Sequence, residues 1–202
     1  MSLRNFIGLL LRPFTEIEVV PAARTIAAPA DRPGTRQKKP VMLVLLPCGP
    51  VEREDVDFLM GALSARGMKV VIAVERKVPT ATFNVARRQY RADVFLNMAQ
   101  NEPGDQVLAV TNYDLYSGGL NFVFGLAESP GKSAVISLFR LRRGANEETF
   151  RCRAVKEAVH ELGHTWGLSH CQNPRCVMHF SNSLEDTDRK EMDWCERCDR
   201  KL

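Results

Sequence analysis

The sequence predicts an α/β (α+β) fold, in which a mixed, twisted sheet of about five strands packs on a long helix. From residue 41 onward, short apolar runs alternate with helical patterns, which is typical of a sheet with parallel strands. The last long helix carries a histidine-rich stretch, and four cysteines follow it in two close pairs. The 202 residues suffice for one core, and 45% hydrophobic with 26% charged residues is an ordinary globular composition.

Residues 1–40 are predicted to be a basic N-terminal extension or linker. They hold seven basic and three acidic residues, whereas the remaining charges balance, so the net charge of +4 comes from this segment. Glu16–Val20 alternates like an edge strand, and four prolines between Pro21 and Pro40 indicate a linker. No aromatic interleaving or nucleic-acid motif accompanies the basic residues, so the flank is interpreted as solvated and no nucleic-acid partner is expected.

The chain is predicted to be cytoplasmic. Its first apolar run, Phe6–Leu11, is too short to span a bilayer and is not followed by a signal-peptide cleavage site. No other segment of the sequence approaches membrane-spanning length. We therefore expect no membrane partner, and a monomer.

The elements before the long helix follow from periodicity. Val41–Leu46 is a continuous apolar run, as in a buried parallel strand, and the helical spacing within 51–66 ends at Gly67. A helical pattern is also expected over 83–99, with Phe83 and Tyr90 on one side. The remaining expected strands are 70–74 (buried), 107–110, 121–126 and 133–141.

The stretch His160–His170 reads H-E-x-x-H-x-x-G-x-x-H. On a helix, His160 and His164 lie roughly 40° apart on one face, so both imidazoles can bind one ion. Glu161 then lies beside the metal, where a base is needed, and not on it. Glycine at 167 allows a left-handed turn that brings His170 back to the same ion. Three imidazoles leave zinc's fourth position open for water, as in catalytic sites, whereas a bare H-E-x-x-H also occurs by chance on amphipathic helices.

The helix that carries this motif is expected to be a rigid platform. Asn146 can cap its first turn, where Glu147 and Glu148 suit the positive end of the helix dipole. An i+4 ladder is interpreted as core packing against the sheet, and the histidines face a cleft. The ladder consists of Phe150, Ala154, Ala158, Leu162 and Trp166.

The second cluster comprises Cys171, Cys176, Cys195 and Cys198. Their C-x4-C and C-x2-C spacing fits a closed, tetrahedral structural zinc site. Two disulfides are the alternative, which a cytoplasmic setting disfavours. Ser183 and Asp186 resemble a capping box, which predicts a helix over 184–194 that leads to the second cysteine pair. The other two cysteines, Cys48 and Cys152, are interpreted as small buried hydrophobes.

Together these motifs resemble the archaemetzincins, a branch of the metzincin metallopeptidases with a second zinc. The resemblance rests on the histidine motif, on C171-x4-C176-x-M178 and on C195-x-x-C198. It implies a metzincin-like catalytic domain at 41–202, with an N-terminal subdomain at 41–167 and a C-terminal subdomain at 168–202. It also implies two Zn²⁺ per chain: a catalytic zinc on His160, His164 and His170, and a structural zinc on Cys171, Cys176, Cys195 and Cys198.

The resemblance implies zinc-dependent hydrolysis of a peptide bond, with a peptide or protein as substrate. Glu161 would be the general base and then the general acid. Met178 would be the residue of the Met-turn beneath the metal, although by itself it reads as core filler. Some metzincins place an assisting tyrosine two residues later, where this chain has Phe180, so that role is absent and His179 is no demonstrated substitute.

Asn121–Leu126 resembles the antiparallel edge strand along which metzincins lay an extended substrate. The same run could be an interior strand, but its glycines favour the sheet margin. Two other functions stay open: a zinc-stabilised binding module with little hydrolytic activity, and an interaction protein that recruits a partner through its cysteine site. Intact Glu161 disfavours the binding module, which has no need of a base.

Overall fold

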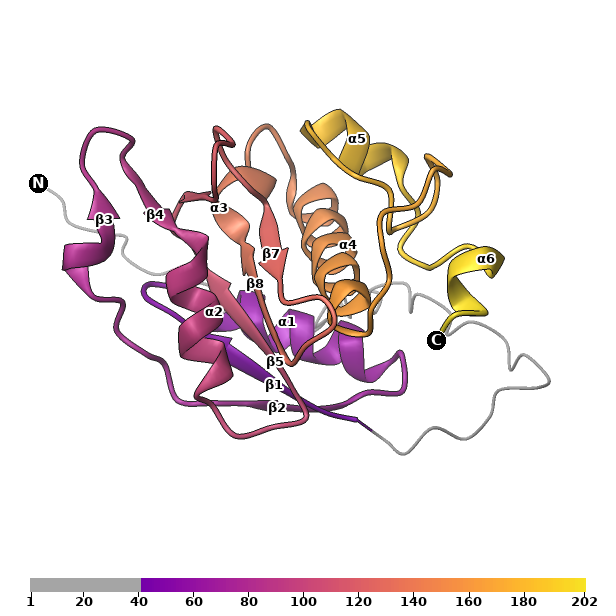
Figure 1. Ribbon diagram of the computed structural model, residues 1–202, viewed down its shortest axis with the longest axis horizontal. Coiled ribbons are helices and arrows are strands. Elements are labelled where there is room, and N and C mark those ends of the chain that lie inside the picture. The colour runs from indigo at the N-terminus through magenta and orange to yellow at the C-terminus, as the bar shows by residue number, and fades with distance from the viewer. Residues whose placement is uncertain (1–40) are drawn as a thin grey trace, which may run out of the picture. The chain divides into compact units, whose positions relative to one another are not determined.

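The computed structural model describes residues 41–202, and the predicted strand at Glu16–Val20 lies outside them (Figure 1). Five strands form a main sheet in the order β2-β1-β5-β8-β7. The first four run parallel and β7 is antiparallel to β8, as the sequence predicted for the sheet and its edge strand. These strands are β1 (Met42–Pro47), β2 (Lys69–Ile72), β5 (Gln106–Thr111), β7 (Gly125–Ala127) and β8 (Ser133–Ser137).

Helices cover both faces of this sheet. Alternate residues of β1 point to opposite sides, so Leu43 and Leu45 belong to one core cluster and Val44 and Leu46 to the other. α1 and α4 pack in the first cluster and α2 in the second. Burial on both faces explains the unbroken apolar sequence of β1. The helices are α1 (Arg53–Ser64), α2 (Ala92–Gln100), α3 (Leu138–Leu141), α4 (Glu147–Thr165), α5 (Leu184–Arg189) and α6 (Glu196–Asp199).

The helix predicted over 83–99 is only partly present. A one-turn 3-10 helix, η1 (Thr80–Thr82), leads into a hairpin of β3 (Phe83–Asn84) and β4 (Gln89–Arg91), and α2 begins only at Ala92. Phe83 and Tyr90 are cross-strand partners whose rings lie 5.0 Å apart. A spacing of seven residues suits two helical turns and this hairpin equally, which explains the error. β6 (Leu115–Tyr116) completes the small sheet, in the order β3-β4-β6.

Other predicted elements differ from the structure in their burial or in their bounds. β2 is an edge strand with Val71 exposed, so it is not a fully buried strand. The strand predicted over 133–141 ends at Ser137, whose side chain accepts a hydrogen bond from the Phe139 amide and caps α3. The helix predicted over 184–194 has the predicted capping box but ends at Arg189, because Lys190 is extended and buries its side chain.

α4 has the predicted construction. The Asn146 side chain accepts a hydrogen bond from the Thr149 amide at the N-terminus. The ladder is buried from Phe150 to Leu162, and Trp166 is half-buried at its end. Gly167 has φ +86°, the left-handed conformation expected where the helix ends. Figure 1 shows α4 beside β7 and β8, with the C-terminal segment and its two short helices beyond it.

Among the described residues, no helix is both long enough and apolar enough to cross a membrane. The cytoplasmic location stays a prediction, as does the subdomain boundary between residues 167 and 168.

Candidate active site and metal-binding clusters

The histidines of the motif converge on one point. Nε2 of His164 lies 3.2 Å from Nε2 of His160 and 3.2 Å from Nε2 of His170. His160 and His164 come from adjacent turns of α4, and the turn at Gly167 returns His170 to them. Tetrahedral zinc with Zn–N bonds of about 2.0–2.1 Å would separate its ligand nitrogens by about 3.3 Å. The spacing of the three Nε2 atoms therefore fits a zinc ion.

Hydrogen bonds fix the tautomers of two of these rings. Nδ1 of His160 donates to the Val177 carbonyl at 2.7 Å, and Nδ1 of His164 donates to the Leu168 carbonyl at 2.6 Å. With the proton on Nδ1, each Nε2 keeps a free lone pair for a metal. Burial lowers the pKa of all three histidines, and that of His160 falls well below its usual value. The neutral form that metal binding requires is therefore favoured.

The histidines open into a cleft of about 610 Å³. One wall is α4, with His160, Glu161 and His164, and the opposite wall is residues 120–127, which end in β7. The predicted strand at 121–126 is therefore displaced, since regular pairing begins only at Gly125. The Phe124 carbonyl and the Glu128 amide form backbone hydrogen bonds with β8. In an antiparallel ladder the residues of a strand alternate between pointing their N–H and C=O groups toward the partner strand and away from it. The backbone groups of Gly125 and Ala127 therefore point away from β8.

Glu161 lies at the floor of this cleft and is only 4% exposed. Burial raises the pKa of its carboxyl well above the usual value, and the neighbouring Glu157 raises it further. Gly125 of β7 faces this side chain so closely that a Cβ there would lie 2.5 Å from the Glu161 Oε1. A glycine is therefore required at this position of β7 if Glu161 is to keep its place.

The four cysteines form the second cluster. Sγ of Cys171 lies 3.7 Å from Sγ of Cys195, and Sγ of Cys176 lies 3.8 Å from Sγ of Cys198. Zn–S bonds of about 2.3 Å in a tetrahedron separate sulfurs by about 3.8 Å, whereas a disulfide needs about 2.05 Å. The cysteines are free thiols in this arrangement, and the spacing fits zinc rather than the disulfide alternative.

Donors that stabilise thiolates surround these sulfurs. Arg197 donates to Sγ of Cys171 at 3.3 Å, and the Cys195 amide donates to Sγ of Cys176 at 3.3 Å. Burial acts to raise the pKa of Cys195, but hydrogen bonds to its sulfur outweigh it and bring that pKa to about 7. A depressed thiol pKa favours the metal-binding form of this residue.

The loop between the clusters connects them. The Cys171 amide donates a hydrogen bond to the Met178 carbonyl at 2.9 Å. The carbonyl of the neighbouring Val177 accepts the hydrogen bond from His160 described above. Met178 is fully buried under α4, where a Cβ on Gly163 would lie 2.4 Å from its sulfur. This close approach was not recognised from the sequence, although the glycine within the motif could have signalled it.

The remaining candidates lie outside both ligand sets. Phe180 is exposed, with its ring 5.0 Å from that of His170, and His179 Nδ1 bonds to the Cys171 carbonyl at 2.8 Å. Cys48 is fully buried as predicted, and burial raises its thiol pKa to about 12. Cys152 is only half-buried on α4, which corrects its assignment as a buried residue.

Comparison with known proteins bears on this arrangement of residues. The model of peptidase family M54 matches residues 62–202. The chain belongs to the archaemetzincins, peptidase family M54. It is 42% identical over 177 residues to the archaemetzincin of Pyrococcus abyssi, covering 80% of this chain and 94% of that protein. It is 46% identical over 134 residues to that of Archaeoglobus fulgidus, covering 66% and 81%.

Solved archaemetzincin structures share the fold. The crystal structure from Archaeoglobus fulgidus, complexed with malonate, gives a TM-score of 0.74 at 41% identity and covers 80% of this chain and 99% of that one. The structure from Methanopyrus kandleri gives a TM-score of 0.73 at 38% identity, with coverage of 81% and 96%. As an archaemetzincin, this protein is a zinc metallopeptidase, as the sequence predicted. A peptidase implies peptide or protein substrates.

Sequence reasoning missed two charged residues of the archaemetzincin cleft, Glu157 and Lys190. Both are buried, at 4% and 2% exposure, and both line the cleft beside Glu161. The i, i+4 spacing of Glu157 and Glu161 was visible in the sequence as a pair of carboxyls on one helix face. Nothing in the spacing indicated Lys190, which arrives from a segment about thirty residues away in sequence.

Proposed function

We propose that this protein hydrolyses peptide bonds with a zinc ion held by His160, His164 and His170 and with Glu161 as general base and acid. The observation that carries the proposal is the convergence of three Nε2 atoms, two of them with their protons fixed on Nδ1. Imidazole nitrogens at 3.2 Å repel unless a proton or a cation lies between them. A zinc ion bound there supplies a Lewis acid that activates water and polarises a carbonyl.

The chain's own groups provide the proton transfers. Glu161 faces the cleft from the same helix as two of the histidines, within reach of a water molecule at the open side of the cluster. Its carboxylate takes a proton from the attacking water and returns it to the leaving amine. Burial raises the pKa of this carboxyl, which makes its carboxylate a stronger base toward water.

The substrate is expected to bind as an added strand along β7. The outward backbone groups of Gly125 and Ala127 can pair with an extended peptide whatever its side chains are. This wall faces Glu161 across the cleft, so a peptide paired with β7 would pass its backbone over the histidine cluster. An edge strand whose backbone groups can pair with an extended peptide favours a peptide substrate over a small molecule.

The cysteine cluster is proposed to hold a second, structural zinc. Four sulfurs fill a tetrahedron and leave no position for water or substrate. Three of the four cysteines are buried, whereas the histidine cluster opens to the cleft. This ion would stabilise the C-terminal segment and thereby the loop that supports His160.

Turnover of a mixed peptide library tests the proposed reaction. The parent protein should cleave peptides, lose activity with a chelator and regain it with added Zn²⁺. Glu161→Gln keeps the size of the side chain but removes the base, so turnover should fall by about 10²–10⁴-fold. Its zinc content should equal that of the parent, because Glu161 is not a ligand.

Two results would contradict this function. Unchanged turnover by Glu161→Gln on any peptide that the parent cleaves would exclude Glu161 as the base. A parent that binds peptides and zinc but hydrolyses none would instead be a zinc-stabilised binding module.

Elemental analysis of protein purified without added metal tests the two sites together. The proposal predicts two zinc ions per chain. His160→Ala with His164→Ala should reduce the content to one, and the remaining ion should resist dialysis against a weak chelator, because four thiolates enclose it. A parent with a single zinc and oxidised cysteines would overturn the second site.

A further inference from the structure

Glu157 is a buried acidic residue of the cleft that the reaction described above does not use. It lies one helical turn before Glu161 on α4, and both carboxyls are 4% exposed. Both side chains line the same cleft. Residues four apart on a helix are neighbours on one face, so the Glu157 side chain bounds the space in which the Glu161 carboxyl can point.

Lys190 holds this pair from the C-terminal segment. Its side chain is 2% exposed, and Nζ donates to the His179 carbonyl at 3.2 Å. Burial lowers the pKa of this lysine, while the charges of Glu157 and Glu161 act in the opposite direction. Lys190 lines the same cleft as Glu157 and Glu161, where its charge can compensate negative charge.

The position of Lys190 is set by the anchoring of α5 to α4. Arg153 donates from Nε and Nη2 to the two carboxylate oxygens of Asp188, both at 2.7 Å. Lys156 Nζ donates to the carbonyls of Thr187 and Asp188 at 3.1 and 2.9 Å, which satisfies groups at the end of α5. These contacts fix the last turn of α5, and Lys190 follows it directly.

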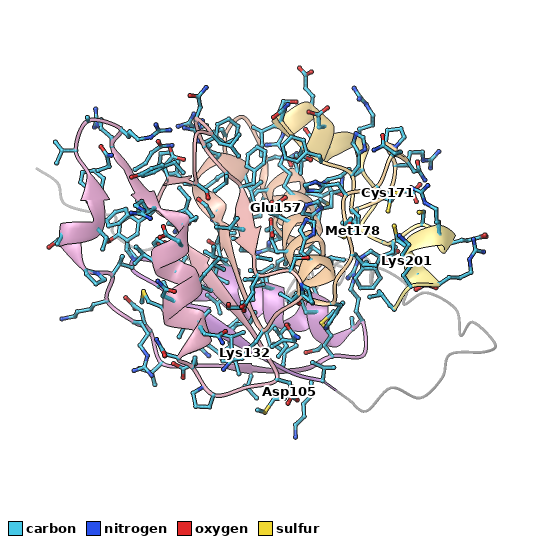
Figure 2. The ribbon with its side chains drawn as sticks, viewed as in Figure 1. Asp105, Lys132, Glu157, Cys171, Met178 and Lys201 are labelled. Carbon is cyan, nitrogen blue, oxygen red and sulfur yellow. The ribbon has the colours of Figure 1, made fainter. Side chains whose placement is uncertain are left out.

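The opposite side of Glu161 is bounded by β7. A Cβ at Gly125 would lie 2.5, 2.6 and 2.8 Å from Oε1, Cγ and Cδ of Glu161. The Glu161 side chain therefore lies against the backbone of β7, and Glu157 lies one helical turn away on the same face of α4. Figure 2 labels Glu157 on α4, next to the C-terminal segment that carries Met178.

We propose that Glu157 is a positioning residue for Glu161, and that Lys190, delivered by α5, holds Glu157 in place. The inference rests on the proposed function, because it assigns a partner to the proposed base. Buried charged groups add little net stability compared with apolar residues of similar size. The fold therefore gives no reason of its own for two carboxyls and an ammonium group at this point, whereas orienting a base does.

The test compares Glu157→Ala with Glu157→Gln. Alanine removes the carboxyl beside Glu161, so kcat should fall about 10- to 100-fold, the effect of a misplaced reacting group, while KM stays within about twofold. Glutamine keeps the length and a hydrogen-bonding head, so it should restore most of the lost kcat. Glu148→Gln, an exposed change in the first turn of the same helix, is the matched control and should match the parent.

Two readouts separate positioning from a purely structural role. Zinc content should stay close to that of the parent in both Glu157 variants, and Glu157→Gln should also keep a melting temperature close to that of the parent. Crystal structures should show the Glu161 carboxyl displaced in Glu157→Ala and restored in Glu157→Gln. Lys190→Met provides a second disturbance of the same cluster and should also lower kcat without raising KM.

Several outcomes would overturn the proposal. A kcat of Glu157→Ala equal to that of the parent would exclude a positioning role for Glu157. A loss of activity that is explained by reduced zinc content or by a raised KM would exclude it as well. Unfolding of both Glu157→Ala and Lys190→Met would make the cluster a structural one. If the parent hydrolyses peptides and Glu161→Gln abolishes this while Glu157→Ala does not affect it, only the positioning role fails. If the parent hydrolyses nothing, the proposed function fails instead.

Discussion

The histidine and cysteine clusters are joined by one short loop but differ in almost every property that decides what a metal site does. The histidines offer three nitrogens and become steadily more exposed from His160 to His170 toward the cleft. The cysteines offer four sulfurs, mostly buried and hydrogen-bonded by Arg197 and by backbone amides. Under the proposed function, ligand number and access would make the histidine cluster the catalytic site and the cysteine cluster the structural one.

The two clusters also depend on each other unequally. His160 donates to the carbonyl of Val177, which lies between Cys176 and Met178, so the cysteine loop holds one proposed catalytic ligand in its tautomer. No comparable bond links a cysteine sulfur to a histidine ring among residues 41–202. A disturbance of the cysteine cluster should therefore reach the histidines more readily than the reverse.

The largest effects are expected when either cluster is removed. Cys195→Ser with Cys198→Ser should lower the melting temperature markedly and weaken zinc binding at the histidines, because the loop through Val177 loses its anchor. His160→Ala with His164→Ala should abolish turnover at much smaller cost in stability, because the buried ladder of α4 remains. Thermal melts and zinc titrations of both double variants measure the contrast. A more destabilising histidine pair would reverse the two roles.

Two glycines, one on α4 and one on β7, allow effects on stability to be separated from effects on catalysis. Gly163→Ala presses on the buried Met178 and should cost about 1–3 kcal/mol of stability, as overpacking does. Gly125→Ala presses on Glu161 instead, so it should lower kcat more than the melting temperature. Gly61→Ala in α1 meets open space and is the control, expected to be neutral or stabilising. Equal losses of kcat and stability in both test variants would contradict this division.

The smallest effect is expected at the anchor of α5. Arg153 holds the pKa of Asp188 below its usual value, so the ionised carboxylate stabilises the fold above the unfolded-state pKa of about 3.9. That contribution is lost as the pH falls through the lower folded-state pKa. The Asp188 side chain is 41% exposed, so Asp188→Asn should cost less than about 1 kcal/mol near neutral pH.

Urea melts of Asp188→Asn and its parent at several pH values measure this term. The difference in unfolding free energy between them should shrink as the pH falls toward 3, since the parent's carboxylate then becomes protonated as well. Glu147→Gln, which removes an exposed i, i+4 pair with Arg151, is the matched control with little expected effect. A difference that grows on acidification would exclude the assigned pKa direction.

Both clusters that could hold a metal ion were visible in the sequence, because their members occur in closely spaced groups. Helical periodicity places His160 and His164 on one face, and the glycine at 167 marks the turn that returns His170. The same local logic predicted the Asn146 cap and the capping box at Ser183. It failed over 83–99 because a seven-residue spacing fits a hairpin as well as a helix.

The surroundings of Glu161 were decided only by the tertiary structure. Gly125 reaches it because β7 lies at the edge of the main sheet beside α4, and Lys190 reaches it because Arg153 and Lys156 hold α5 against the same helix. These contacts join segments about thirty or more residues apart in sequence. No periodicity along the chain encodes such pairings, because they depend on how complete elements pack against one another. The sequence by itself therefore determined which residues can hold metal, and the packing of β7 and α5 on α4 determined what surrounds the proposed base.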